Sequence, residues 1–379
     1  MDHENKYDNY DLLTDFDTLY RAYKKARKGT RWKDGTALYC ARALECTLAL
    51  KELLEKEQFK PKVRRTFYVY EPKKRLIVAS EFYEKVAQRA LCDEILRPAL
   101  MPKVIADNYA SQVGKGTHYG LERLEEQLRH FYRRHGTNGF ILKADIRHYF
   151  PSTDHDMLKA LYREYFEDPR LLRFIDTIID SWKDEDESTP GHDRGTPLGF
   201  DLSQISGVYI LSKLDHYIKD ERGIKYYGRY MDDFFVIAET KAELYSILED
   251  AKRIIGEMGY QVNEKTAVFP ISSGIDFLGF HTYITDTGKV IRKVRAKSKN
   301  RERRKLKRLK ELLEAEDSKI EFEDVRTSYQ AWRAHASHGN CYYLISKMDA
   351  YFDDLFRDYI KDDKAKAFSG KPIKKKKKG

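Results

Sequence analysis

The feature that most restricts the fold is a pair of acids set between two strand-like runs. Residues 224–230 and 234–238 are rich in aromatic and β-branched residues, and the three residues between them, 231–233, read Met-Asp-Asp. So short a connection predicts an antiparallel hairpin whose turn exposes its side chains. The chain is therefore expected to contain a sheet with two adjacent carboxylates at one end.

A third acid follows another strand-like run. Residues 140–144 are mostly apolar and precede Asp145. If this strand pairs beside the hairpin, the carboxylates of Asp145, Asp232 and Asp233 lie close together. Such carboxylates repel one another unless divalent cations lie between them, and Mg²⁺ suits the site because it binds one or two carboxylates together with phosphate oxygens. A pair of these ions can stabilise the attacking and leaving oxygens of a phosphoryl transfer.

The same aromatic-x-Asp-Asp pattern occurs a second time in a different context. Residues 351–354 read Tyr-Phe-Asp-Asp, but the apolar residues around them recur every three to four positions. That period predicts a helix with its acids in solvent. Because 35% of the residues are charged, adjacent acids also arise by chance, and it is the strand context that makes 230–233 the candidate site.

The order of helical and strand-like segments predicts an α+β fold. The first hundred residues are mainly helical by period, apart from a β pair at 66–79. The middle of the chain mixes both periods, with a helix expected over about 202–220 and one strand over 275–284. Helical period returns from residue 299 onward. This order favours an antiparallel sheet covered by helices, with helical segments before and after it.

The net charge of +10 comes from two short segments. Residues 292–310 hold 12 basic residues and one acid, and residues 371–379 hold six lysines and no acid, which leaves the remainder at −7. A basic stretch with so few acids indicates contact with a polyanion such as a phosphate backbone. For the terminal lysines, a solvated tail fits equally well.

Cysteine usage and hydropathy exclude several classes of protein. The four cysteines have no CxxC spacing, and the 11 histidines have no metal-ligand spacing, so neither a disulfide scaffold nor a zinc ribbon is expected. The polar start of the chain does not resemble a signal peptide, and no apolar run reaches the roughly 18 residues that a membrane span needs. We expect a cytoplasmic protein without membrane contact.

Five segments, in order, resemble the motifs of reverse transcriptases. They are DIRHYFPS at 145–152 (motif A), GTPLGFDLSQ at 195–204 (motif B), YMDD at 230–233 (motif C), GYQVNEKT at 259–266 (motif D) and FLG at 277–279 (motif E). Each motif alone is a weak signal, but five in the family's order at plausible spacings are a strong one. The resemblance covers about residues 18–360.

Motif B and three segments outside the five motifs indicate which subfamily of reverse transcriptases the chain resembles. Most reverse transcriptases have Pro-Gln-Gly in motif B, whereas this chain has Leu198 in place of the Gln and ends the motif in Ser203-Gln204. The enzymes of diversity-generating retroelements resemble it here and also at EPKKRLI (71–77), GKGTH (114–118) and SYQAWRAHASHG (328–339). Residues 84–85 and 200–202 depart from that subfamily, so phage-defence reverse transcriptases remain an alternative.

The resemblance implies a right-hand polymerase that makes cDNA from an RNA template by two-metal nucleotidyl transfer. N-terminal helices and fingers would occupy residues 1–139, a palm with motifs A to E 140–288, a basic helical thumb 289–361 and a disordered lysine-rich tail 362–379. The retroelement subfamily further implies low fidelity, a role in sequence diversification (mutagenic retrohoming) and the cytoplasm of a bacterial or phage-infected cell.

The family's catalytic roles carry over onto five residues. Asp145 and Asp232 would bridge two Mg²⁺ ions, for which Mn²⁺ can substitute, and the Ile146 carbonyl would complete the ligand set. Asp233 would support the site with weaker ligation. The primer 3′-hydroxyl would attack the α-phosphate of a dNTP and displace pyrophosphate. Lys265 matches the motif D lysine, a proton donor to pyrophosphate, although by itself it reads as a surface lysine.

A second set of residues would bind the incoming nucleotide. Lys74 and Arg75, after the fingers turn, would hold the triphosphate. Phe150 would leave no room for a 2′-hydroxyl and so favour dNTPs over NTPs. Leu198 cannot make the polar contacts of the family's Gln, which motivates the hypothesis of low fidelity. The remaining members of this set are Arg147, Gly199 and Gln204.

The implied partners are an RNA template, a DNA or RNA primer, the RNA–DNA hybrid and dNTPs, together with a small helical accessory protein. The hybrid would be held through its shape and phosphates without reading its sequence. The residues expected to contact nucleic acid are Lys115, Arg292, Lys293, Arg295, Lys297, Arg303 and Arg304. An alternative of another class is a non-catalytic nucleic-acid-binding protein on a polymerase fold, against which the intact acids argue.

Overall fold

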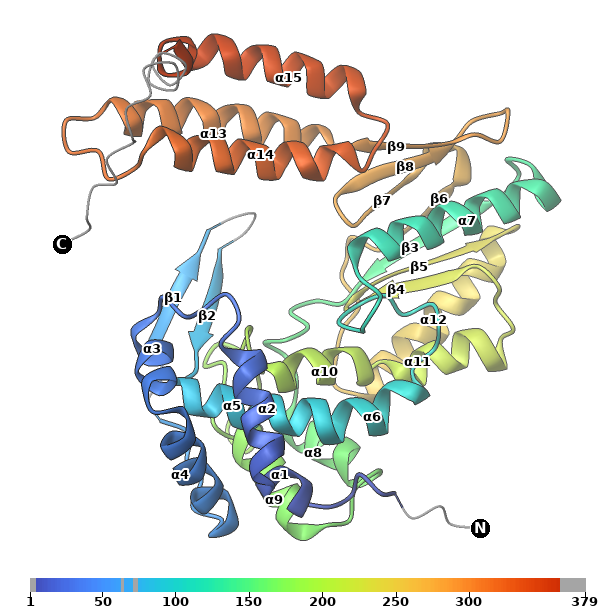
Figure 1. The fold of residues 1–379 in the computed structure, drawn as a ribbon. Helices are drawn as coiled ribbons and strands as arrows, with labels where there is room; N and C mark the ends of the chain where they lie inside the picture. Colours follow the sequence, from blue (N-terminus) through green and yellow to red (C-terminus); the bar gives the residue numbers. More distant parts are fainter. Residues whose placement is uncertain (1–4, 63–64, 71–73, 362–379) are drawn as a thin grey trace. The chain divides into compact units, whose positions relative to one another are not determined.

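The computed structural model describes residues 5–62, 65–70 and 74–361 (Figure 1). The chain forms two compact units. The first unit contains Met1–Arg123 and Gly139–Phe269, and the second contains Leu124–Asn138 and Pro270–Gly379. The functional division into fingers, palm, thumb and tail stays a prediction, and the expected lysine-rich tail at 362–379 lies outside the described residues.

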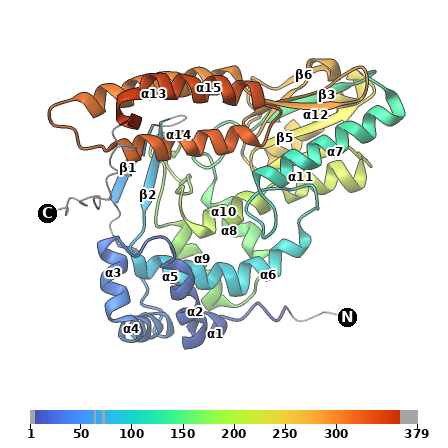
Figure 2. The same ribbon diagram turned by 45° about the horizontal axis from the view of Figure 1, so that its top comes forward.

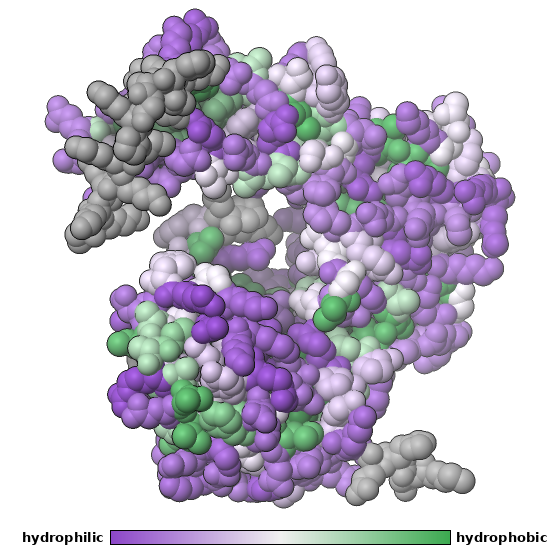
Figure 3. Space-filling model, viewed as in Figure 1, coloured by the Kyte–Doolittle hydropathy of each residue, from purple (hydrophilic) through white to green (hydrophobic). Residues whose placement is uncertain are grey.

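Four helices begin the first unit: α1 (Asp11–Thr14), α2 (Phe16–Ala26), α3 (Asp34–Ala41) and α4 (Ala43–Glu55). The Asp15 side chain caps α2 by accepting the N–H of Thr18. One face of α2 is buried and packs against α4 and against α5 (Phe82–Ala90). The outer faces of α3 and α4 leave apolar side chains in solvent, Leu38 and Leu44 among them, and Figure 3 shows hydrophobic surface over these helices.

The expected β pair forms a two-stranded antiparallel hairpin of β1 (Arg65–Val69) and β2 (Arg75–Ala79). Its register runs from Arg65 opposite Ala79 to Val69 opposite Arg75. Every side chain of β1 is exposed. The predicted turn after Tyr70 falls at 71–73, outside the described residues.

The helical period of the first hundred residues ends in a helix that is interrupted by a π-helical segment. It consists of α5, the π-helix η1 (Leu91–Leu96), α6 (Arg97–Leu100) and the short 3₁₀ turn η2 (Met101–Lys103). After a loop, α7 (Thr117–His135) begins just past Gly114 and Gly116. A π-helical turn keeps helical geometry and shifts the exposed face, so hydrophobic period alone does not reveal it.

A four-stranded sheet forms the centre of the first unit. Its order is β4 (Tyr227–Tyr230), β5 (Asp233–Ala238), β3 (Phe140–Asp145) and β6 (Ala267–Pro270), with β5 antiparallel to both β4 and β3. Helix α12 (Lys241–Glu257) packs against β3 and β5 (Figure 1). The predicted hairpin around Met-Asp-Asp is therefore present, and the strand predicted over 140–145 lies beside it.

The remaining helices of the first unit are α8 (His155–Arg163), α9 (Pro169–Ile179), α10 (Asp201–Tyr209), α11 (Ser212–His216) and the π-helix η3 (Tyr217–Glu221). The single helix predicted over 202–220 is wrong, because the chain breaks between α10 and α11. Val208, Ile210 and Leu211 are all buried at this break. A segment buried on all sides has no solvent face, so its hydrophobic pattern does not mark where a helix ends.

The second unit contains a three-stranded antiparallel sheet in the order β7 (Ile275–Phe277), β8 (Phe280–Ile284) and β9 (Val290–Val294). The prediction of one strand over 275–284 is wrong: Leu278 and Gly279 take positive φ values of 47° and 91° and form a two-residue hairpin turn. The helical period expected from residue 299 onward is present, but the sequence did not predict the strand β9, which precedes the helix that begins at Ala296.

Three helices follow in the second unit, after the short turn η4 (Ile271–Ser273) that precedes its sheet: α13 (Ala296–Glu314), α14 (Phe322–Ser337) and α15 (Tyr342–Leu355). They pack side by side, as both views show (Figures 1 and 2). Tyr329 of α14 stacks on Phe352 of α15 with ring centroids 4.5 Å apart. Asp353 and Asp354 lie on the exposed face of α15, which confirms the helical interpretation of the second Asp-Asp pair.

The structure confirms the predicted α+β class, with antiparallel sheets and many helices. Among the described residues, every helix is too short or too polar to cross a bilayer.

Candidate active site

The three sequence-predicted acids meet at one end of the central sheet. Asp145 is the last residue of β3 and lies opposite Asp233, the first residue of β5. Asp232 lies in the turn between β4 and β5, and its backbone carbonyl accepts the N–H of Ile146 at 3.3 Å. Strand register and this bond therefore fix where the Asp145 and Asp232 backbones stand relative to each other.

The turn between β4 and β5 has an unusual backbone conformation. Met231 has a φ of 56°, in the left-handed region that bulky residues rarely occupy, and its side chain is buried. Such a conformation persists only where the surrounding structure holds it, and functional sites are where it concentrates.

The carboxyl groups of Asp145 and Asp232 interact directly. Burial, together with the negative charge and the hydrogen bond of Asp145, raises the pKa of Asp232 to about 6. Two acids held this way repel each other when both are ionised. A bound cation would relieve that repulsion, so the pair has the electrostatic character of a cation site.

The donor set fits a Mg²⁺ ion. The Ile146 carbonyl is a third candidate oxygen ligand beside the two carboxylates. Ile146 forms an isolated β-bridge with Val262, and the hydrogen bonds of this bridge use the Asp145 carbonyl and the Arg147 N–H. The Ile146 carbonyl therefore takes no part in it. No cluster of three or more His, Cys, Asp or Glu side chains suited to a metal occurs in the described parts of the chain. Substrate phosphates and water would have to supply the other ligands, as is usual for Mg²⁺.

Asp233 differs from Asp145 and Asp232 because its carboxylate is paired with a lysine. Lys143, two residues before Asp145 on the same face of β3, forms an ion pair with the Asp233 carboxylate. The charge of Lys143 also acts to lower the pKa of Asp232. Sequence reasoning missed Lys143, although the period of two along a strand places it on the same face as Asp145.

Motif D is hydrogen-bonded to β3 through Asn263, a second residue that the sequence did not predict. Its backbone N–H donates to the Asp145 carbonyl at 2.7 Å, and its side-chain amide donates to Asp145 Oδ2 at 3.1 Å. The Asn263 Oδ1 in turn accepts the N–H of Lys265 at 3.0 Å. Lys265 itself is exposed, so this turn orients the backbone of the predicted proton donor and leaves its side chain free to move.

Motifs A and B are joined by hydrogen bonds around Phe150. The Phe150 carbonyl accepts the N–H of Thr196 at 2.9 Å. The Phe150 ring lies over Gly207 of α10, where an added Cβ would come within 3.0 Å of it, and the Met231 sulfur is also near that position. Gly207 therefore lets the Phe150 ring approach α10 closely beside the turn.

The other predicted residues of motif B lie around the start of α10. Leu198 is half-buried, Gly199 has a φ of 109° and faces the Val78 carbonyl of β2, and Gln204 accepts the Ser111 hydroxyl at 3.2 Å. Asp201, which departs from the resembled subfamily, pairs with Arg89 of α5 at 3.0 Å. That departure thus joins α10 to α5.

The predicted triphosphate ligands are exposed. Arg75 starts β2, and the Lys74 ammonium lies 4.1 Å from the centroid of the Tyr68 ring. Arg147 is exposed at the carboxylate end of β3, where its N–H donates to the Gln261 carbonyl at 2.9 Å. These cations are available to an anionic ligand.

The predicted nucleic-acid contacts divide into two groups. One group is exposed on β9, on α13 and at the residue between them: Lys293, Arg295, Lys297, Arg303 and Arg304. Arg292 is not available, since its guanidinium pairs with Glu125 at 2.8 Å and donates to the His338 carbonyl at 3.0 Å. Lys115 also folds onto its own loop, where its ammonium donates to the Ala106 and Asn108 carbonyls.

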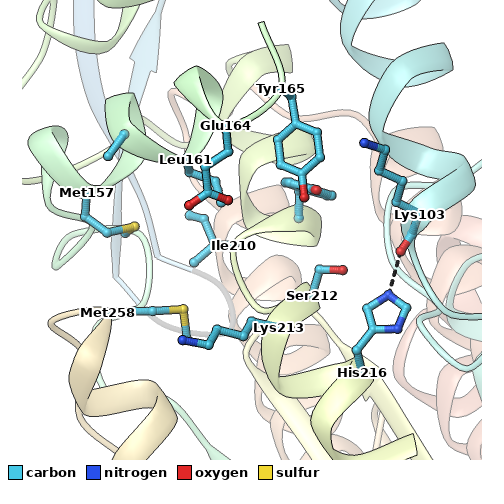
Figure 4. Close-up of a pocket in the computed structure, with 12 residues that line it drawn as sticks. Lys103, Met157, Leu161, Glu164, Tyr165, Ile210, Ser212, Lys213, His216 and Met258 are labelled. Carbon is cyan, nitrogen blue, oxygen red and sulfur yellow. Dashed lines mark hydrogen bonds between the residues drawn. The ribbon is translucent and has the colours of Figure 1, made fainter. Parts of the chain in front are cut away.

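A pocket of about 420 Å³ opens elsewhere on the first unit (Figure 4). Its lining comes from α8, α10, α11 and neighbouring segments, and among the described residues it includes no sequence-predicted site residue. Lys103 closes one side, with its ammonium 3.9 Å from the Tyr165 ring centroid and its carbonyl bonded to His216. The carboxylate site lies outside this pocket.

Comparison with known proteins identifies the family. The family described as reverse transcriptase (RNA-dependent DNA polymerase) matches residues 61–282, more than half of the chain. The chain therefore belongs to the reverse transcriptase family, and RNA-directed DNA polymerase, the enzyme class predicted from the motifs, is the class of that family.

Two solved structures of telomerase are similar to the chain. Telomerase from Candida albicans, in complex with a fragment of telomeric RNA, is 15% identical with a TM-score of 0.45, and the match covers 82% of this chain and 59% of that one. Apo telomerase from Candida tropicalis is 15% identical with a TM-score of 0.42, covering 60% and 48%. The chain thus spans about half to three-fifths of these proteins. No curated protein matches it.

Proposed function

We propose that this chain copies RNA into DNA by extending a DNA or RNA primer with dNTPs. The observation that carries the proposal is the Asp145–Asp232 carboxylate pair, held at the end of β3 and in the β4–β5 turn with the pKa of Asp232 raised to about 6. Family membership supports it independently, because the motifs that supply these acids fall within the matched residues.

Asp145, Asp232 and the Ile146 carbonyl would hold the divalent ions, Mg²⁺ or Mn²⁺. When bound, such ions make a hydroxyl more acidic and neutralise charge that develops on phosphate oxygens. We assign no direct ligation to Asp233, because Lys143 already neutralises it. Asn263 holds the Asp145 carboxylate through its amide and so limits the directions in which that group can turn.

In the proposed reaction the primer 3′-oxygen bonds to the α-phosphorus of the dNTP as the bond from that phosphorus to pyrophosphate breaks. The primer hydroxyl loses its proton, and Lys265, exposed beside Asn263, would donate one to the leaving pyrophosphate. Lys74 and Arg75 would hold the triphosphate. Phe150 would contact the sugar and exclude a 2′-hydroxyl.

Primer extension tests the proposal. Purified protein is incubated with Mg²⁺, an RNA template, a DNA primer and either dNTPs or NTPs, and the expected result is template-dependent extension with dNTPs. Asp145→Asn should abolish it. The matched control is Asp353→Asn, from the exposed Asp-Asp pair on α15, which should extend normally. Binding of the hybrid without extension, even with an accessory partner, would favour the non-catalytic alternative.

Low fidelity and a role in sequence diversification belong to the same proposal. They rest on Leu198, an apolar, half-buried residue where the family carries a Gln able to make polar contacts. We expect Leu198→Gln to lower misincorporation, above all opposite template adenines, by several-fold, roughly the effect of one hydrogen bond. A single-nucleotide misincorporation assay measures it, with correct incorporation as the control. Equal error rates in both proteins would exclude this role for Leu198.

Phage defence is the alternative biological role, and a small helical accessory protein is a proposed partner in either case. A template repeat, a variable repeat and a small helical accessory gene beside the coding sequence would favour diversification. Their absence, together with untemplated or repetitive products in the extension assay, would favour defence.

A further inference from the structure

A fully buried ion pair lies directly beneath the catalytic turn. Arg229 of β4 and Asp215 of α11 have no exposed side-chain surface, and they form a two-pronged contact. Arg229 Nε donates to Asp215 Oδ1 at 2.7 Å, and Nη2 donates to Oδ2 at 2.6 Å. The Tyr227 hydroxyl donates to the same carboxylate at 2.6 Å. Nothing in the proposed reaction uses this pair as an acid, a base or a ligand.

The guanidinium also donates to two backbone carbonyls that matter for the site. Nη1 donates to the Met231 carbonyl at 2.8 Å, and Nη2 donates to the Val208 carbonyl at 2.8 Å. Met231 is the residue with positive φ in the catalytic turn. Val208 follows Gly207, the glycine on which the Phe150 ring lies. One side chain therefore joins the turn that carries Asp232 to the helix that supports Phe150.

Backbone hydrogen bonds and close packing fix the position of the Arg229 main chain. Its N–H donates to the Asp107 carbonyl at 3.0 Å, and its carbonyl accepts the N–H of Tyr109 at 2.9 Å. The adjacent Gly228 packs so closely that an added Cβ would lie 2.5 Å from the Tyr109 hydroxyl. The guanidinium thus reaches the Met231 carbonyl from a fixed support.

We infer that Arg229 is a positioning residue for the catalytic turn, with Asp215 as the counter-charge that permits its burial. By bonding the Met231 carbonyl, Arg229 holds the left-handed conformation of Met231 and so sets the direction of the Asp232 carboxylate. This inference rests on the proposed polymerase function for its consequence, but the positioning itself is a property of the turn.

The geometry requires arginine. Nε, Nη1 and Nη2 donate in fixed directions to two carboxylate oxygens and two carbonyls, whereas a lysine ammonium is a single point that cannot reach all four. A purely structural ion pair behaves differently, because apolar residues of similar size often replace a buried pair without loss of stability. The two roles therefore predict different outcomes for the same variants.

The experiment compares Arg229→Lys and the double variant Arg229→Met/Asp215→Leu with wild type. Single-nucleotide incorporation gives kcat and the KM for dNTP, and hydrogen exchange reports the opening of residues 228–236. We expect kcat to fall about 100-fold, the cost of a small misplacement of reacting groups, with KM changed less than about threefold. Exchange at the turn should accelerate. The matched control is Ile178→Ala in the core of α9, which should lower Tm yet leave kcat unchanged.

Each possible result either supports or overturns the positioning role of Arg229. Wild-type kcat and turn protection in a folded double variant would show that the pair is only structural and overturn it. If the double variant does not fold, Arg229→Lys, which keeps the charge facing Asp215, decides by the same two readouts. If wild type incorporates no nucleotide, the proposed function fails, and unchanged exchange at 228–236 in the variants would separately overturn the positioning role.

Discussion

At the scale of single residues, the three acids of the site have different roles because their surroundings differ. Asp145 extends from a strand end and accepts a hydrogen bond from Asn263. Asp232 lies in a strained turn, where burial and Asp145 raise its pKa to about 6. Asp233 pairs with Lys143. We therefore expect Asp145 and Asp232 to be needed for metal binding and Asp233 to be needed mainly for the local structure.

The raised pKa of Asp232 predicts a pH-dependent gain in stability for Asp232→Asn. The folded protein binds this proton more tightly than the unfolded chain does, so wild-type stability falls as pH rises from about 4 through about 6. Asparagine carries no charge and avoids that loss. In metal-free buffer we expect a gain of about 3 kcal/mol at pH 8 and none below pH 4, measured by urea unfolding. A difference independent of pH would contradict this interpretation.

Phe150 predicts a change in sugar selectivity. Phe150→Ala removes the ring that lies on Gly207, so a 2′-hydroxyl gains room, and we expect the preference for dNTP over NTP to fall about tenfold or more. Competitive incorporation of dNTP and NTP opposite one template base measures the ratio. Phe174→Leu in the core of α9 controls for loss of apolar volume. An unchanged ratio would exclude Phe150 as the selective contact.

At the scale of elements, sequence periodicity succeeded where one face of a segment is buried. The strand β3, whose side chains are only partly buried, has the bounds that its pattern predicts, within a residue or two. Prediction failed where burial is complete, as between α10 and α11. It also missed β9, because Arg292 and Lys293 of this strand belong to the basic stretch that continues into α13.

The distinction between Arg292 and the cations of α13 leads to a prediction about salt dependence. Arg303 and Arg304 are exposed, and each phosphate contact contributes about −0.9 to the slope of log K against log salt. Arg303→Gln/Arg304→Gln should therefore make the slope for hybrid binding shallower by about 2, measured by fluorescence anisotropy. Lys252→Gln/Arg253→Gln on α12, whose cations pair with Glu249 and Glu257, is the control. Equal slopes for wild type and the Arg303→Gln/Arg304→Gln variant would show that these residues of α13 do not contact phosphates of the hybrid.

At the scale of the whole molecule, ordered motifs predicted more than composition could. The family follows from five short segments, because each is tied to a chemical role and they occur in one order, whereas the α+β class follows from the order of helical and strand-like segments. The contacts that support the site were not predictable in this way. Asn263, Lys143 and Arg229 become meaningful only when folding brings them against Asp145, Asp233 and the Met231 carbonyl.

The basic stretch and the acids of the site lie in different units. The stretch 292–310 carries +11 and lies in the second unit, while the proposed catalytic acids Asp145, Asp232 and Asp233 lie in the first. We therefore expect variants in α13 to change affinity for the hybrid, and variants at the acids to change the rate of incorporation once the hybrid is bound.

The most direct test of the central claim, that Asp145 and Asp232 form the catalytic pair, is the single-turnover rate of one dNTP incorporation on a pre-bound RNA–DNA hybrid. We expect Asp232→Asn to lower this rate by about 10²- to 10³-fold with unchanged affinity for the hybrid, whereas Asp353→Asn should retain the wild-type rate. A wild-type rate for Asp232→Asn, or an equal loss in both variants, would contradict it.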